Sequence, residues 1–75
     1  MEIIIVPTAI PTSDKKFYAH FSLIEKMGNA MTGVSFKIEN KTYFDSEMEA
    51  LSAAKIMGEF EVKKMYGNNI QFIFT

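Results

Sequence analysis

The fold is decided by residues 44–57, which read FDSEMEALSAAKIM. Ser46 and Glu49 have the spacing of a capping box, in which each side chain accepts a hydrogen bond from the other residue's backbone amide. Acidic residues at this end also stabilise a helix, because their negative charge interacts favourably with the positive end of the helix dipole. Strong helix formers follow, among them Ala50, Ala53 and Ala54. The stretch therefore predicts a helix that begins after Ser46.

The predicted helix has two unlike faces. At 3.6 residues per turn, one broad arc contains small and apolar residues, namely Ala50, Leu51, Ala53, Ala54, Met57, Gly58 and Phe60. The opposite arc is polar and contains Glu49, Ser52, Lys55, Glu59 and Lys63. Because alanine side chains permit a close approach of backbones, we expect this helix to lie flat on a sheet.

The sequence allows two alternative C-terminal ends for this helix. The favoured one continues it to Tyr66 and ends it at Gly67-Asn68, where glycine can take a positive φ. The other ends it at Gly58, since a glycine inside a helix costs about 1 kcal/mol. In that alternative, residues 59–65 form a strand.

Strands are predicted before and after the helix. Residues 1–6 contain four consecutive β-branched residues, which are typical of an interior strand. Pro7 and Pro11 are expected to end it and to make residues 8–14 a loop. The alternation of apolar residues after Gly67 predicts a closing strand over 70–74.

In the middle of the chain, the sequence predicts a loop over 28–33. A strand is predicted over 34–39, because apolar and polar residues alternate there. Asn40-Lys41 is expected to form a tight turn. That turn leads into a short return strand over 42–44, directly before the helix.

Residues 15–26 allow a strand or a helix. As a strand, Phe17 and Phe21 lie on one side and Tyr18 and His20 on the other. The strand is favoured and gives an α+β fold of order β-β-β-α-β, an antiparallel sheet of three to five strands with one main helix packed on one face. The helix alternative gives the ferredoxin-like order β-α-β-β-α-β. Either way, residues 1–75 are expected to form a single domain.

Residues 43–54, which read YFDSEMEALSAA, resemble a pattern found in small bacterial and phage domains of three strands and one helix. The function of those domains is unknown, so the resemblance implies a fold and no site residues. Three strands and a helix also resemble the DNA-binding arms of integrases and plant AP2 domains. Those domains read DNA with arginine-rich strands, which this chain does not have.

The composition narrows the classes of function. The chain has eight lysines and no arginine, which argues against a dedicated nucleic-acid binder. It has no cysteine, and therefore neither disulfides nor thiolate metal sites. The apolar run at residues 3–6 is too short for a signal peptide or a membrane span. We therefore expect a cytoplasmic protein, located in the host cytoplasm if it is phage-encoded.

No catalytic or cofactor motif can be assembled. His20 is the only histidine, and no nucleophile or set of further ligands accompanies it. The glutamates near the helix are explained by its N-terminus and its solvated face. The glycines match no phosphate-binding loop. We expect no enzyme activity, no metal and no cofactor.

One face of the predicted sheet has no helix to cover it. If Phe17, Phe21, Phe36 and Phe72 face the helix, the other face carries Ile4, Val6, Tyr18, His20, Ile24 and Ile73. Exposed apolar residues of this kind indicate an interface. The expected function is a small non-enzymatic protein-binding module, such as a phage-type accessory protein that inhibits or redirects a host protein. It would act through this face or by forming a homodimer.

The alternative function is a nucleic-acid-binding sheet. Tyr18, Tyr43 and His20 would stack on bases, and lysines would contact phosphates.

Overall fold

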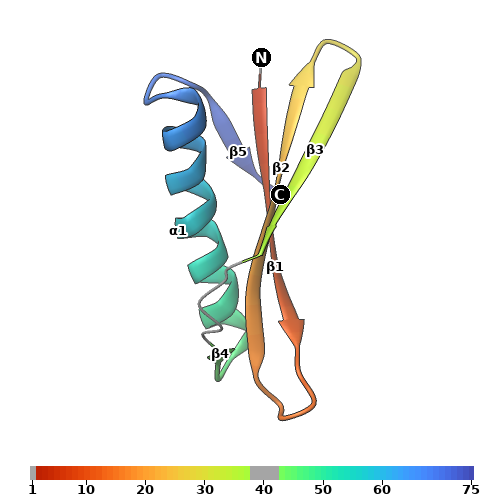
Figure 1. Ribbon diagram of the computed structural model, residues 1–75, viewed down its shortest axis with the longest axis vertical. Helices are drawn as coiled ribbons and strands as arrows, with labels where there is room; N and C mark the ends of the chain where they lie inside the picture. The colour runs from red at the N-terminus through yellow and green to blue at the C-terminus, as the bar shows by residue number, and fades with distance from the viewer. Residues whose placement is uncertain (1, 38–42) are drawn as a thin grey trace.

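The computed structural model describes residues 2–37 and 43–75, which form an open five-stranded sheet and one long helix (Figure 1). The elements in chain order are β1 (Glu2–Pro11), β2 (Phe17–Met27), β3 (Ala30–Lys37), β4 (Tyr43–Phe44), α1 (Glu47–Tyr66) and β5 (Phe72–Phe74). The predicted α+β class with a single main helix is confirmed. Residues 17–27 form a strand, so the ferredoxin-like alternative is wrong.

The sheet is mixed, whereas the sequence predicted an antiparallel one. The strand order is β3-β2-β1-β5, and β4 also pairs with β2. Every pair is antiparallel except β1 and β5, which run parallel. The reason is the length of α1, which carries the chain back along the sheet so that β5 enters beside β1 in the same direction (Figure 1).

β2 and β3 form a hairpin with a two-residue turn. Met27 pairs with Ala30, and Gly28 and Asn29 lie between them. Gly28 has a φ of 59°, which suits the first central position of a type II′ turn and favours glycine. The loop predicted over 28–33 is therefore wrong, because β3 already begins at Ala30 and is described to Lys37.

β1 continues through both prolines, contrary to the prediction that they end the strand. The amide of Ile3 donates to the carbonyl of Gln71 (3.2 Å), and the carbonyl of Ile5 accepts from the amide of Thr75 (3.1 Å). Backbone groups of odd-numbered β1 residues therefore point toward β5. Pro7 and Pro11 are also odd-numbered, and β5 pairs only with residues 3–5. Their missing N–H groups thus interrupt no pairing with a described strand.

β4 does not return along β3 as a hairpin. Tyr43 and Phe44 pair antiparallel with Tyr18 and Phe17 of β2, and β3 is antiparallel to β2 as well. β3 and β4 therefore run in the same direction along one edge of β2. The turn predicted at Asn40-Lys41 lies outside the described residues.

Both ends of α1 follow from local chemistry. The Ser46 hydroxyl accepts from the Glu49 amide (3.1 Å), which confirms the predicted cap. At the other end the Gly67 amide donates to the Lys63 carbonyl (3.0 Å), and Gly67 has a φ of 87°. The favoured long helix is therefore correct. α1 is not long and apolar enough to cross a membrane, and it is the only helix in the described part of the chain.

The core lies between α1 and the adjacent face of β1 and β2 (Figure 1). The buried stripe of α1 repeats every fourth residue: Ala50, Ala54, Gly58 and Val62. A Cβ at Gly58 would lie 2.6 Å from Cγ2 of Ile5, so glycine is what allows α1 to approach this closely. The buried strand residues are Ile3, Ile5, Ala19, Phe21 and Leu23.

The buried arc of α1 differs from the predicted one in three places. Val62 is fully buried and was not predicted, whereas Met57 and Phe60, both assigned to the buried arc, are 41% and 62% exposed. The stripe defined by every fourth residue drifts around a helix of 3.6 residues per turn. Over twenty residues, this drift moves Val62 under the helix and Phe60 to its flank.

Candidate protein-binding surface

The six residues predicted to face away from the helix lie on one face of the sheet. Ile3 and Ile5 are buried under α1, so the residues between and after them, Ile4 and Val6, point to the opposite side. The ladders place the other four on the same side, with Ile24 and Ile73 opposite Ile4 and with His20 and Tyr18 further along β2. The structure therefore brings together Ile4, Val6, Tyr18, His20, Ile24 and Ile73, which we call the helix-free face.

An apolar row crosses one end of the helix-free face. It runs from Ile73 in β5 to Ile4 in β1, Ile24 in β2 and Gly33 in β3, each directly paired with the next. A Cβ at Gly33 would be 3.7 Å from Cγ1 of Ile24, so Ile24 lies over that glycine. Ile4 and Ile24 are partly buried by their neighbours, and Ile73 remains 49% exposed. The row is thus a continuous hydrophobic ridge, exposed most at the β5 edge.

An aromatic pair occupies the other end of the helix-free face. The rings of Tyr18 and Tyr43 have centroids 4.7 Å apart and are tilted by 38°, and their hydroxyls lie 2.9 Å apart within hydrogen-bond distance. Ile10, which pairs with Tyr18, lies on the same face and is 41% exposed. This end therefore combines apolar rings with polar tips, a combination common at protein interfaces.

The middle of the face is polar. His20 pairs with Thr8 on β1, and Ser22 pairs with Val6. Within residues 2–37 and 43–75, no three His, Asp or Glu side chains are grouped so that they could hold a metal ion. The arrangement supplies contacts and hydrogen bonds along the sheet.

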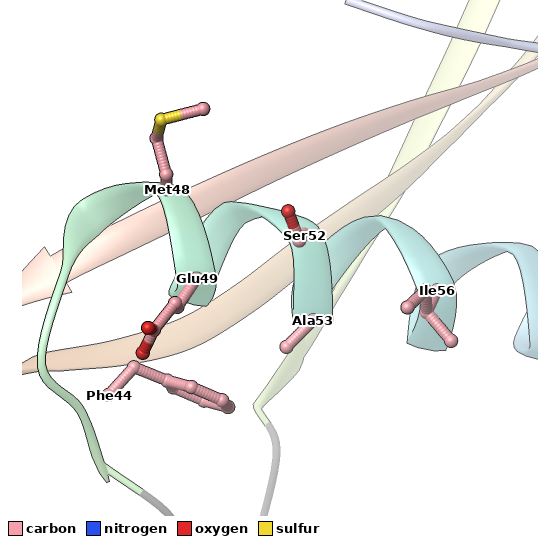
Figure 2. A pocket seen from close by; sticks show the side chains of 6 residues that line it. All are labelled: Phe44, Met48, Glu49, Ser52, Ala53 and Ile56. Atoms are coloured by element: carbon pink, nitrogen blue, oxygen red, sulfur yellow. The ribbon is translucent and has the colours of Figure 1, made fainter.

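A second exposed apolar surface lies on α1, and the sequence analysis missed it. Met48, Ile56 and Phe60 are 78%, 68% and 62% exposed. An open groove of about 450 Å³ follows the first half of the helix and is lined by Phe44, Met48, Glu49, Ser52, Ala53 and Ile56. Figure 2 shows the Phe44 ring on the side to which Glu49 and Ala53 point, with Met48 pointing the opposite way. Met48 and Ile56 are large apolar residues that fall outside the predicted apolar arc. Their position outside that arc could have revealed this exposed surface from the sequence.

The far end of α1 is attached to β2 by a partly buried polar contact. The Tyr66 hydroxyl donates a hydrogen bond to a carboxylate oxygen of Glu25. Burial, followed by this hydrogen bond and the negative charge of Glu25, raises the pKa of Tyr66 to about 12. Because Glu25 lies on the helix side of the sheet, the contact supports the position of α1 and adds nothing to the helix-free face.

Comparison of the chain with protein-family models, with curated proteins and with solved structures finds no match. The interpretation of the helix-free face therefore rests on its own residues.

Proposed function

We propose that the chain is a small non-enzymatic protein-binding module that contacts another protein through the helix-free face. The observation that carries the proposal is the row of Ile73, Ile4 and Ile24, which crosses three paired strands with no described element over it. A partner that covers the row removes apolar area from water, which is worth about 25 cal/mol per Å². Exposed apolar area gathered in one ridge is typical of interaction sites.

The distribution of charge supports the same proposal. The charged pair Glu2 and Lys26 lies alongside the isoleucine row, next to Ile4 and Ile24 on the same two strands. On the other side of the row come Val6 and Ser22, followed by Thr8 and His20. Polar residues on both sides of an apolar strip match the usual anatomy of protein–protein contacts, in which a polar rim surrounds an apolar core. The finer expectation, a phage-type accessory protein that inhibits or redirects a host protein, stays a prediction.

The test compares two identical substitutions on opposite sides of the molecule. Ile73→Lys places a charge in the row, and Ile56→Lys places the same charge on the exposed surface of α1. The wild-type chain and both variants serve as baits, and a protein retained by the wild type is then purified and titrated against all three. We expect binding to weaken at least tenfold for Ile73→Lys and to change little for Ile56→Lys.

Circular dichroism melting of both variants checks that each is folded before the titration. Equal binding by the wild type and Ile73→Lys would contradict the proposal, and selective loss in Ile56→Lys would move the contact to α1.

The tyrosine pair favours a second candidate function, the binding of single-stranded nucleic acid. Tyr18 and Tyr43 lie on the same face as His20, and bases stack on such aromatic rings. Fluorescence anisotropy with a labelled oligonucleotide tests it. The candidate requires binding that weakens steeply as salt increases and that decreases in Tyr43→Ala. Absence of binding at low salt removes it.

A further inference from the structure

The outer edge of β3 presents backbone groups that no described strand uses. In β1 the odd-numbered residues point toward β5, so the even-numbered ones point toward β2. Ile4 pairs with Ile24, so even-numbered β2 residues bond to β1 and odd-numbered ones to β3. Leu23 pairs with Val34, so even-numbered β3 residues bond to β2. The N–H and C=O groups of the odd-numbered residues, Met31, Gly33, Ser35 and Lys37, therefore point outward.

This edge carries few of the features that usually protect an edge strand. β3 is eight residues long, contains no proline and has no charged residue before Lys37. Met31 and Val34 are 56% and 46% exposed. Natural proteins block such edges with prolines, charges, bulges or short strands, and an edge without these features pairs readily with another strand.

The opposite edge of the sheet does carry such protection. Beyond Ile5 that edge belongs to β1, where Pro7 and Pro11 remove the N–H groups that would point outward. β5, which covers the rest of β1, has only three residues. A β3 edge that paired with this opposite edge would join copies head to tail into an open chain, and the prolines oppose that arrangement. The β3 edge is therefore suited to pair with its own counterpart around a two-fold axis.

We propose that two copies of this chain associate by antiparallel pairing of their β3 strands, which makes one continuous sheet. In such a pair, the residues whose backbone groups point outward must lie opposite residues of the same kind in the second copy. This condition allows a register in which Val34 lies opposite Val34 of the second copy. A two-fold axis perpendicular to the sheet places both α1 helices on one side and both helix-free faces on the other. The pairing stands independently of the proposed function, although it would join the two faces into one surface.

The register gives a specific charge test. With Val34 on the axis, Val34 of one copy lies directly opposite Val34 of the other. Val34→Lys would set like charges across the pair, which is destabilising. Met48→Lys places the same charge on exposed helix surface, distant from β3. Sedimentation equilibrium over a concentration series is expected to show a dimer for the wild type and Met48→Lys, and at least tenfold weaker dimerisation for Val34→Lys.

A cysteine series tests the register itself, since the chain has no cysteine. Val34 and its counterpart would form a non-hydrogen-bonded pair with Cα atoms about 4.5 Å apart, which a disulfide can span. Thr32 and its counterpart would lie about 13 Å apart along the strands, given a rise of about 3.3 Å per residue. Under mild oxidation, Val34→Cys should form covalent dimers at least tenfold faster than Thr32→Cys or Met48→Cys.

Two results overturn the proposal. One is a wild-type chain that stays monomeric at every concentration while the three cysteine variants cross-link at equal rates. The other is a dimer that Val34→Lys leaves intact and Val34→Cys does not link, because that dimer uses a different surface. Neither result bears on Ile73→Lys, so failure of this dimer is distinguishable from failure of the proposed partner site.

Discussion

The two faces of β1 carry nearly the same residues and have different surroundings. Ile3 and Ile5 are 0% exposed, whereas Ile4 and Val6, their immediate neighbours, are partly exposed. Residue chemistry cannot explain the difference, because three of the four are isoleucine. The cause is α1, which covers one face of β1 and β2, while no described element covers the other. A run of β-branched residues therefore does not reveal how many of its sides are covered.

The largest expected effect comes from truncating the two faces in parallel. Ile5→Ala removes a side chain packed between α1 and the sheet, and it should lower the free energy of unfolding by about 2–5 kcal/mol. Ile4→Ala removes the same atoms from a partly exposed position and should cost clearly less. Chemical denaturation of both variants measures the difference. Equal losses would mean that the helix-free face is as well packed as the core.

The second prediction concerns the close contact that creates the difference between the faces. Gly58→Ala places a methyl group 2.6 Å from Ile5, so α1 or the sheet must shift, and overpacking of this kind costs about 1–3 kcal/mol. The better helix propensity of alanine offsets about 1 kcal/mol of that cost. Ser52→Ala, on the exposed side of α1, is the control and should be neutral or slightly stabilising. A stabilised Gly58→Ala variant would show that the helix lies farther from β1.

The third prediction tests how the covering helix begins. Ser46→Ala removes the acceptor for the Glu49 amide and should lower the free energy of unfolding by about 1 kcal/mol. Ser13→Ala, in the exposed turn between β1 and β2, is the matched control and should change stability by less than about 0.5 kcal/mol. Thermal melts of both variants measure the effects, and a similar change in the two would argue against the cap.

The fourth prediction concerns the effect of high pH on stability. The pKa of Tyr66 is raised from 10.0 to about 12 in the folded chain, so the folded state holds this proton more tightly than the unfolded state. The resulting stability is fully present below pH 10 and is lost as pH rises from about 10 to about 12. Tyr66→Phe should flatten that part of the stability curve relative to the wild type. Parallel curves for the two proteins would contradict the assigned contact with Glu25.

Several predictions from the sequence are confirmed because their causes are local. The Ser46 cap depends on residues three apart, and the helix end depends on the positive φ of Gly67. The strand at 17–27 was favoured by the alternation of side chains between two sides, a pattern typical of a strand with one buried face. The set of six residues on the helix-free face followed from the same alternation.

Other features could not be predicted because their causes lie far away in the chain. β1 tolerates Pro7 because β5 pairs only with residues 3–5, so no described strand needs the N–H group that proline lacks. Whether a proline ends a strand therefore depends on how far the neighbouring strand extends. The exposure of Phe60 depends on the direction in which α1 crosses β1 and β2. The parallel pairing of β5 depends on the crossover made by the whole helix.

The sequence by itself determined the type and approximate order of the elements and the alternation of side chains on each strand. Backbone propensity, capping and periodicity act over a few residues, so they can be recognised in short stretches of consecutive sequence. Only the tertiary structure decided which strands are neighbours, which edge of β1 tolerates proline, and which side of the Ile3–Val6 run is covered by α1. Those outcomes depend on contacts between distant segments, such as Gly58 against Ile5, and such contacts exist only once the chain has folded.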